Sequence, residues 1–234
     1  MKNISTFIPI IYSDDQLMVF DKPARLLVIP TPKGEEHTLT NIVNEQYALN
    51  QSWKLHPCHR LDRDTSGLII YAKGKNNQQD MMNVFHEKKV VKKYIALVQG
   101  QLKKEKGEIK SKVLNLEKQH FSNTDGKMAV THYQVLRQLK TFAIVLVEIL
   151  TGRTNQIRIH FSDMGHALVG DRKYGRGRDF KTSLKRAALH AAFLQFVHPI
   201  TGQTISLKSE IPEDINKFLV EQSVEVGCSL KEVF

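Results

Sequence analysis

The stretch His59–Ile70 reads HRLDRDTSGLII and joins a run of charged residues to a short apolar segment. The segment Leu68–Tyr71, rich in β-branched and aromatic residues, predicts a strand. Asp62 is therefore expected in a loop that enters a sheet, where a side chain is held firmly and can still face a ligand. The alternative is that Asp62 only caps a turn, with His59 and Arg60 as pairing partners at the surface.

The composition is that of an ordinary globular protein with an excess of positive charge. The chain has 234 residues, of which 41% are hydrophobic and 25% charged. This length suffices for one large domain or two small ones with a self-sufficient core. The formal net charge is +10, and the sequence pI is about 9.5. Such a charge is expected of a protein that binds a polyanion, with a merely basic soluble protein as the alternative.

Cysteine, histidine and hydropathy patterns argue against a metal centre, a disulfide framework and export. Cys58 and Cys228 form no CxxC pair, which suits a reducing cytoplasm. His56, Cys58 and His59 lie close together, but no second ligand cluster accompanies them, so we expect no metal. No stretch approaches the roughly 18 apolar residues of a membrane span, and the N-terminus lacks the apolar core of a secretion signal. We expect a cytoplasmic protein that uses no membrane.

Apolar periodicity predicts many strands and few interleaved helices, which favours an α+β fold with a mixed or antiparallel sheet. Phe142–Ile149 is the clearest strand and is expected to be central and covered on both faces. In the expected helix Asn155–Met164, one apolar stripe consists of Ile157, Phe161 and Met164. The other expected strands are Ile10–Tyr12, Met18–Asp21, Leu68–Ala72, Tyr94–Val98, Thr131–Leu136 and Thr204–Leu207. The other expected helices are Thr38–Leu49, Asn77–Lys89 and Glu213–Gln222.

The stretch around Asp62 resembles the catalytic motif of the RluA family of RNA pseudouridine synthases, and the resemblance extends from about Ile10 to about Leu207. Members of this family convert a uridine already in RNA to its C-glycoside isomer without a metal or an organic cofactor. The resemblance implies the pseudouridine synthase fold, a long bent sheet flanked by helices with a central active-site cleft. The other segments that carry it, in the family's order, are Tyr12–Pro23, Lys92–Gly100, Leu150–His160, Gly165–Asp171 and Leu189–Ala191.

The position of the Lys22-Pro23 motif leads us to expect a single catalytic domain over residues 1–234. The motif lies too near the N-terminus to leave room for the small S4-like RNA-binding domain that many relatives carry. The implied partner is a structured RNA, either rRNA or tRNA, and we expect a monomer.

The resemblance assigns the chemistry to Asp62, Tyr94 and Arg158. Asp62 matches the catalytic carboxylate, and two routes stay open: covalent attack on the nucleotide, or removal of a ribose proton to give a glycal. Arg158 matches its charge partner, since burial would raise the pKa of a carboxyl group and a fixed cation offsets that; an exposed helix cation is the alternative. Tyr94 is expected to stack on the target base and to assist a proton transfer, with core packing as the alternative.

The resemblance also implies residues that bind the RNA around the target base. Arg60 matches the position that fills the stack left by a flipped-out base. His59 is expected to orient the loop, and Leu189 to form an apolar wall beneath the base, with core packing as the alternative.

A basic, glycine-containing loop that begins at Arg172 and continues to Arg186 is the favoured phosphate-binding segment. The run Lys103–Lys112 is a weaker candidate, because it could be only the exterior of a hairpin. The RNA contacts expected outside the motif are Lys93, Arg172, Tyr174, Arg176 and Arg178.

The chain departs from the family pattern at three positions: Arg25 stands where Gly is usual, Ile29 where His is common, and Ala167 where Pro is usual. Arg25 is expected to alter RNA contacts or the loop backbone, because Gly tolerates a positive φ and Arg does not readily. Two other functions compete with the enzyme. One is a non-catalytic RNA-binding protein on the same scaffold, and the other is a ribonuclease with His59 and Asp62 as acid and base.

Overall fold

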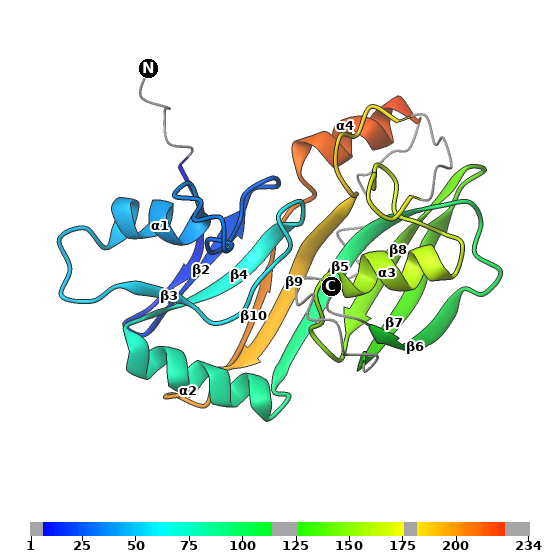
Figure 1. The fold of residues 1–234 in the computed structure, drawn as a ribbon. Helices are drawn as coiled ribbons and strands as arrows, with labels where there is room; N and C mark the ends of the chain where they lie inside the picture. The colour runs from blue at the N-terminus through cyan, green and yellow to red at the C-terminus, as the bar shows by residue number, and fades with distance from the viewer. Residues whose placement is uncertain (1–6, 114–125, 176–181, 223–234) are drawn as a thin grey trace, which may run out of the picture. The chain divides into compact units, whose positions relative to one another are not determined.

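The computed structural model describes residues 7–113, 126–175 and 182–222. These residues contain ten strands and four helices, and the chain divides into two compact units. Unit 1 comprises residues 1–90 and 191–210, and unit 2 comprises residues 91–190 and 211–234. Figure 1 shows the elements with the labels used below.

Unit 1 is built on a sheet in which β1, β2, β4 and β9 follow one another, with β3 paired to β4 and β10 paired to β9. The pairs β1/β2, β2/β4, β3/β4 and β9/β10 are antiparallel. The strand bounds are Ile10–Ser13 (β1), Leu17–Lys22 (β2), Leu55–Pro57 (β3), Ser66–Lys73 (β4), Leu189–Val197 (β9, within this unit from residue 191) and Thr204–Lys208 (β10).

Two helices, α1 (Leu39–Tyr47) and α2 (Lys75–His86), belong to unit 1 (Figure 1). The side chain of Thr38 caps α1 by accepting a hydrogen bond from the Asn41 N–H. Met81 and Val84 of α2 are buried in the apolar cluster that β2 and β4 supply. Burial of this apolar stripe is what holds α2 on the sheet, since an isolated helix of this length is marginal in water.

Unit 2 contains an antiparallel sheet in the order β5-β8-β7-β6. Its strands are Val90–Gln99 (β5, within this unit from residue 91), Lys106–Val113 (β6), Lys127–Gln138 (β7) and Phe142–Ile149 (β8). Its helices are Gln156–Asp163 (α3) and Glu213–Glu221 (α4). Phe161 of α3 meets Tyr133 of β7 edge to face, and Phe218 of α4 packs on Phe142 of β8.

The predicted α+β class is confirmed, and so is each predicted strand and helix, with bounds that differ by a few residues. Three strands were not predicted: β3, β6 and β9. In β6, the pattern KGEIKSKV is mostly polar and alternates between exposed and half-buried side chains, which is how a strand at a sheet edge reads. The suggestion that Lys103–Lys112 forms a hairpin exterior is therefore confirmed for β6, which pairs with β7.

One predicted helix face was partly wrong. Ile157 and Phe161 are buried as expected, but Met164 is 38% exposed, because α3 ends at Asp163 before its stripe reaches a third residue. Within the described residues, no helix is long and apolar enough to cross a lipid bilayer.

Candidate active site

The loop that carries Asp62, residues 58–65, joins β3 to β4 in unit 1, and the prediction that Asp62 lies in a loop entering a strand is confirmed. We call it the Asp62 loop. Its first residue is tied to β4 by a bond from the Cys58 N–H to the Ile70 carbonyl, 2.9 Å long. A turn follows, in which the Thr65 N–H bonds to the Asp62 carbonyl at 3.1 Å. Leu61 is buried and Asp62 half-buried, so the carboxylate is held on a fixed backbone without being sealed in the core.

His59 fastens this loop to two elements of unit 1. Its Nε2 accepts a hydrogen bond from the Ile70 N–H at 3.0 Å, and its ring lies 5.2 Å from the Phe85 ring of α2, between centroids. A ring nitrogen that accepts carries no proton, so this contact requires the neutral imidazole with its proton on Nδ1. The geometry supports the interpretation that His59 orients the loop. Arg60, next to it, is exposed.

Lys22 connects the Asp62 loop to the loop after β2, a role that the sequence did not reveal. Its side chain is fully buried, and its Nζ donates to the carbonyls of Pro23 and Leu26 at 2.8 Å and of Arg63 at 3.2 Å. A buried ammonium is tolerated when its three donors are used in this way. The only sequence signal is a lysine directly before a proline at the end of an apolar strand.

Arg25, the departure from the family's glycine, has a backbone φ of 64°. The backbone here is left-handed, a conformation that Gly adopts freely and Arg only at a cost. Arg25 therefore keeps a glycine-like backbone conformation and is strained in it, which is an effect on the loop backbone of the kind predicted. Of the other two departures, Ile29 is exposed, whereas Ala167 is buried and its carbonyl accepts from the Gln99 N–H at 2.9 Å.

Gly67 is the second residue of β4, directly after the Asp62 loop. Its φ is +110°, and a Cβ built on it would lie 2.3 Å from the Ala191 carbonyl oxygen of β9. A side chain here would collide with backbone, so glycine is what allows β4 and β9 to approach at this point.

Tyr94, Lys93 and Leu189 belong to unit 2. Tyr94 lies in β5 and is 5% exposed, opposite Val147 of β8. Lys93 is half-buried, opposite Glu148. Leu189 begins β9 and is 3% exposed, and its carbonyl accepts from Arg186 Nη1 at 3.1 Å. Burial also lowers the pKa of Lys92, next to Lys93.

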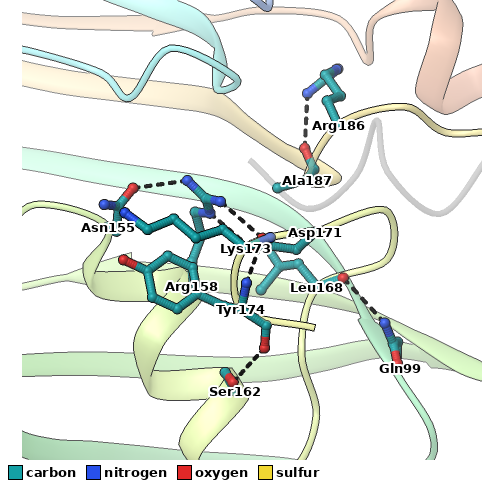
Figure 2. A network of polar contacts seen from close by, with 10 residues as sticks. All are labelled: Gln99, Asn155, Arg158, Ser162, Leu168, Asp171, Lys173, Tyr174, Arg186 and Ala187. Atoms are coloured by element: carbon teal, nitrogen blue, oxygen red, sulfur yellow. Dashed lines mark hydrogen bonds and ion pairs between the residues drawn. The ribbon is translucent and has the colours of Figure 1, made fainter. Parts of the chain in front are cut away.

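Arg158 lies in α3 and is only 8% exposed, so the alternative of an exposed helix cation is wrong. Its Nε and Nη2 donate to Asp171 Oδ2 and Oδ1 at 2.7 and 2.8 Å, and its Nη1 donates to Asn155 Oδ1 at 2.8 Å (Figure 2). The Tyr174 ring covers the guanidinium, with 4.9 Å from Cζ to the ring centroid. We call these four residues the Arg158 network.

The start of the basic loop is shaped by the same aspartate. Asp171 Oδ1 also accepts from the Lys173 and Tyr174 N–H groups at 3.0 and 3.1 Å. Ser162 Oγ of α3 donates to the Tyr174 carbonyl at 2.7 Å (Figure 2). Arg172 is exposed, as a phosphate-binding residue must be, whereas Tyr174 already packs on Arg158. Arg176 and Arg178 lie outside the described residues.

Arg186, at the end of that loop, was expected to face RNA, but its side chain is buried. Arg186 is 2% exposed and forms a bidentate ion pair with Asp214 of α4, at 2.6 and 2.8 Å. It also donates to the carbonyls of Ala187 and Leu189. Arg186 therefore fastens α4 to the segment that leads into β9, and its inclusion in the phosphate-binding run was wrong.

The Asp62 loop offers no reactive thiol, and the described residues offer no metal site. Cys58, the nearest thiol along the chain, has its pKa raised to about 12 by burial, so it is no nucleophile at neutral pH. Within the described residues, no three His, Cys, Asp or Glu side chains are grouped so that they could hold a metal ion.

Comparison with known families gives one match over most of the chain: residues 16–163 match the family described as RNA pseudouridylate synthase. The chain is 34% identical over 213 residues to the uncharacterized RNA pseudouridine synthase YhcT of Bacillus subtilis, a match that covers 88% of this chain and 69% of that protein. It is 36% identical over 221 residues to the ribosomal large subunit pseudouridine synthase D of Nitrosomonas europaea, covering 90% of this chain and 64% of that protein.

A solved structure has the same fold. The human RNA pseudouridylate synthase domain containing 4 superposes with a TM-score of 0.75 at 24% identity, covering 92% of this chain and 93% of the human one.

Proposed function

The chain belongs to the family of RNA pseudouridylate synthases, which are isomerases, and from this premise we propose that it converts a specific uridine of rRNA or tRNA to pseudouridine with Asp62 as the catalytic carboxylate. The observation that carries the proposal is the half-buried Asp62 on a loop fastened at Cys58, His59 and Arg63. A catalytic group must be held in one geometry and yet reach the substrate, and this loop meets both conditions.

The reaction needs a group of this kind. The C–N glycosidic bond breaks, the base rotates, and its C5 joins the ribose, which requires covalent catalysis or proton transfer close to the sugar. A stacked base is out of reach, so the nucleotide flips out at a cost of a few kcal/mol. In the proposal, the exposed Arg60 fills the vacated stack, Tyr94 stacks on the flipped base, and Leu189 forms its apolar wall.

Arg158 has the proposed role of keeping Asp62 ionised. A guanidinium stays charged even where it is buried, and Arg158 is both buried and fixed in orientation. Lys93, Arg172, Arg176 and Arg178 are proposed to bind RNA phosphates. Their contribution is electrostatic and depends on the salt concentration.

The names of several relatives favour ribosomal RNA as the substrate. The proteins from Nitrosomonas europaea and Zymomonas mobilis are both called ribosomal large subunit pseudouridine synthase D. We propose further that residues 1–234 work as one catalytic domain, as a cytoplasmic monomer without metal or cofactor. Activity is then expected to persist in excess EDTA, and its loss there would contradict the metal-free proposal.

The decisive test uses RNA whose uridines carry tritium at C5, because the new bond to the ribose displaces that hydrogen. Wild-type protein is expected to release tritium from ribosomal RNA, and Asp62→Asn to release it at least about a thousandfold more slowly. RNA binding without tritium release from rRNA or tRNA would favour the non-catalytic RNA-binding alternative. Shortened RNA on a denaturing gel would favour the ribonuclease, since isomerisation leaves chain length unchanged.

A further inference from the structure

We propose that Asp171 and Asn155 are positioning residues that hold the Arg158 guanidinium in the one orientation in which it serves the catalytic carboxylate. This inference rests on the proposed function of Arg158. It is carried by three hydrogen bonds of 2.7–2.8 Å that end on a single side chain from two different segments, the start of α3 and the loop after it (Figure 2).

The three bonds determine how the planar group is turned. Asp171 takes the edge formed by Nε and Nη2, and Asn155 takes one hydrogen of Nη1. A guanidinium is a rigid planar fork, so bonds from Nε, Nη2 and Nη1 together fix both its plane and its rotation about the side chain. A fork that is fixed on one edge presents its other donors in a fixed direction.

Asp171 is itself held rigidly, as a positioning residue must be. Its side chain is fully buried. One of its oxygens accepts from two backbone N–H groups, those of Lys173 and Tyr174. Ser162 of α3 then bonds the Tyr174 carbonyl, and the Tyr174 ring covers the guanidinium. The backbone of the loop therefore fixes the Asp171 carboxylate, and the carboxylate in turn fixes the Arg158 guanidinium.

Asn155 gives independent support to the positioning of Arg158, because its side chain bonds the guanidinium and does not cap its own helix. It is the N-cap residue of α3, where an Asn side chain ordinarily accepts a hydrogen bond from the helix backbone. Here it makes no such bond, and its oxygen accepts from Arg158 Nη1. It also has a φ of 54°, in the left-handed region. The first turn of α3 therefore lacks a side-chain cap from Asn155, whose oxygen bonds the Arg158 guanidinium.

Stability alone does not account for the ion pair. Burying an arginine and an aspartate removes both from water, and the desolvation cost is often as large as the attraction between them. A buried bidentate pair of this kind is better explained by what it does to the geometry of Arg158 than by a gain in fold stability.

The test compares kcat, measured by tritium release at saturating rRNA, with RNA affinity. Asp171→Asn is expected to lower kcat by roughly 10- to 100-fold with RNA affinity within about twofold of wild type, because the amide cannot accept from Nε and Nη2 together. Asn155→Gly removes the bond from Nη1 while keeping a residue type that adopts positive φ freely, and is expected to cost roughly 3- to 10-fold in kcat. Asn155→Asp keeps the acceptor and is expected to stay within about threefold of wild type.

A double-mutant cycle shows whether Asp171 acts through Arg158. Lysine at position 158 keeps the charge but has no fork, so Asp171→Asn is expected to cost less than about threefold in kcat when introduced into Arg158→Lys. Asp214→Asn is the matched control, since it breaks another bidentate Arg–Asp pair of unit 2. It is expected to lower the melting temperature and to change kcat less than threefold.

Each outcome decides a different point. Full kcat in both Asp171→Asn and Asn155→Gly would overturn the inference while leaving the proposed function standing. Equal losses from Asp171→Asn in both backgrounds, with a lowered melting temperature, would reduce Asp171 to a structural residue and overturn it too. Wild-type protein without tritium release would instead remove the proposed function on which the inference depends.

Discussion

At the scale of single residues, Arg25 is a large side chain in a backbone conformation that favours glycine. Its φ is 64°, and a left-handed conformation costs an L-residue about 1–2 kcal/mol. Part of that cost is offset because glycine loses more chain entropy on folding. Arg25→Gly is therefore expected to raise the free energy of unfolding by about 0.5 kcal/mol in urea denaturation.

The control for this substitution is Lys110→Gly in β6, where the backbone is extended and glycine only weakens the strand. It is expected to lower the free energy of unfolding by about 0.5–1 kcal/mol. A decrease at both positions would mean that the strain at Arg25 is not energetically important.

Lys22 is the second residue whose substitution is expected to change both the stability of the fold and the Asp62 loop. Lys22→Met keeps the shape but leaves three backbone carbonyls, of which that of Leu26 is buried, without the ammonium that bonds them. The expected loss in the free energy of unfolding is about 3 kcal/mol, with a fall in kcat because the Asp62 loop loses its tie at Arg63. Lys54→Met, at an exposed lysine, is the control and should lie within about 0.5 kcal/mol of wild type in the same measurement.

At the scale of elements, the approach of β4 to β9 depends on Gly67. An alanine there would place its Cβ 2.3 Å from a backbone oxygen of Ala191, and neither strand can move without shifting others. Gly67→Ala is expected to lower the free energy of unfolding by more than about 3 kcal/mol and to reduce activity, since β4 supports the Asp62 loop.

Gly34→Ala separates the two causes of that loss. Gly34 also has a positive φ, +75°, but nothing lies within 4 Å of its Cβ position. Its substitution should cost only about 1 kcal/mol in thermal or urea denaturation. If both variants lost the same amount, backbone conformation and not strand approach would explain the role of Gly67.

At the scale of the whole molecule, the net charge of +10 is expected to govern affinity for RNA. Changing Arg176 and Arg178 to Gln should weaken binding and reduce the slope of log K against log salt concentration by about 1.5, since each lost phosphate contact removes about 0.7–0.9. The measurement is a salt titration of RNA binding by fluorescence anisotropy.

The matched control neutralises two exposed lysines of β6, Lys110 and Lys112, which carry the same charge on the less favoured segment. Their substitution by Gln is expected to leave the slope nearly unchanged. An equal reduction in both variants would mean that general charge, and not the loop after Asp171, binds the phosphates.

Local patterns in the chain were enough to establish the α+β class, the family and the place of Asp62 before β4. Those features depend on neighbouring residues: an apolar run such as Phe142–Ile149 forms a strand through its own side chains, and a catalytic motif is a short contiguous segment. Three strands escape local prediction: β3 is only three residues long, β6 is polar at a sheet edge, and β9 contains the adjacent alanines Ala191 and Ala192, which have low strand propensity.

The partners of charged residues were decided only by the tertiary structure. Arg158 and Arg186 look alike in the sequence, yet each is buried against an aspartate that lies further along the chain, Asp171 and Asp214. Lys22 likewise bonds Arg63, which is 41 positions away. An arginine or lysine looks the same in the sequence whether its side chain faces water or an acidic partner. Which of the two it contacts is decided by the packing of segments that are distant in sequence.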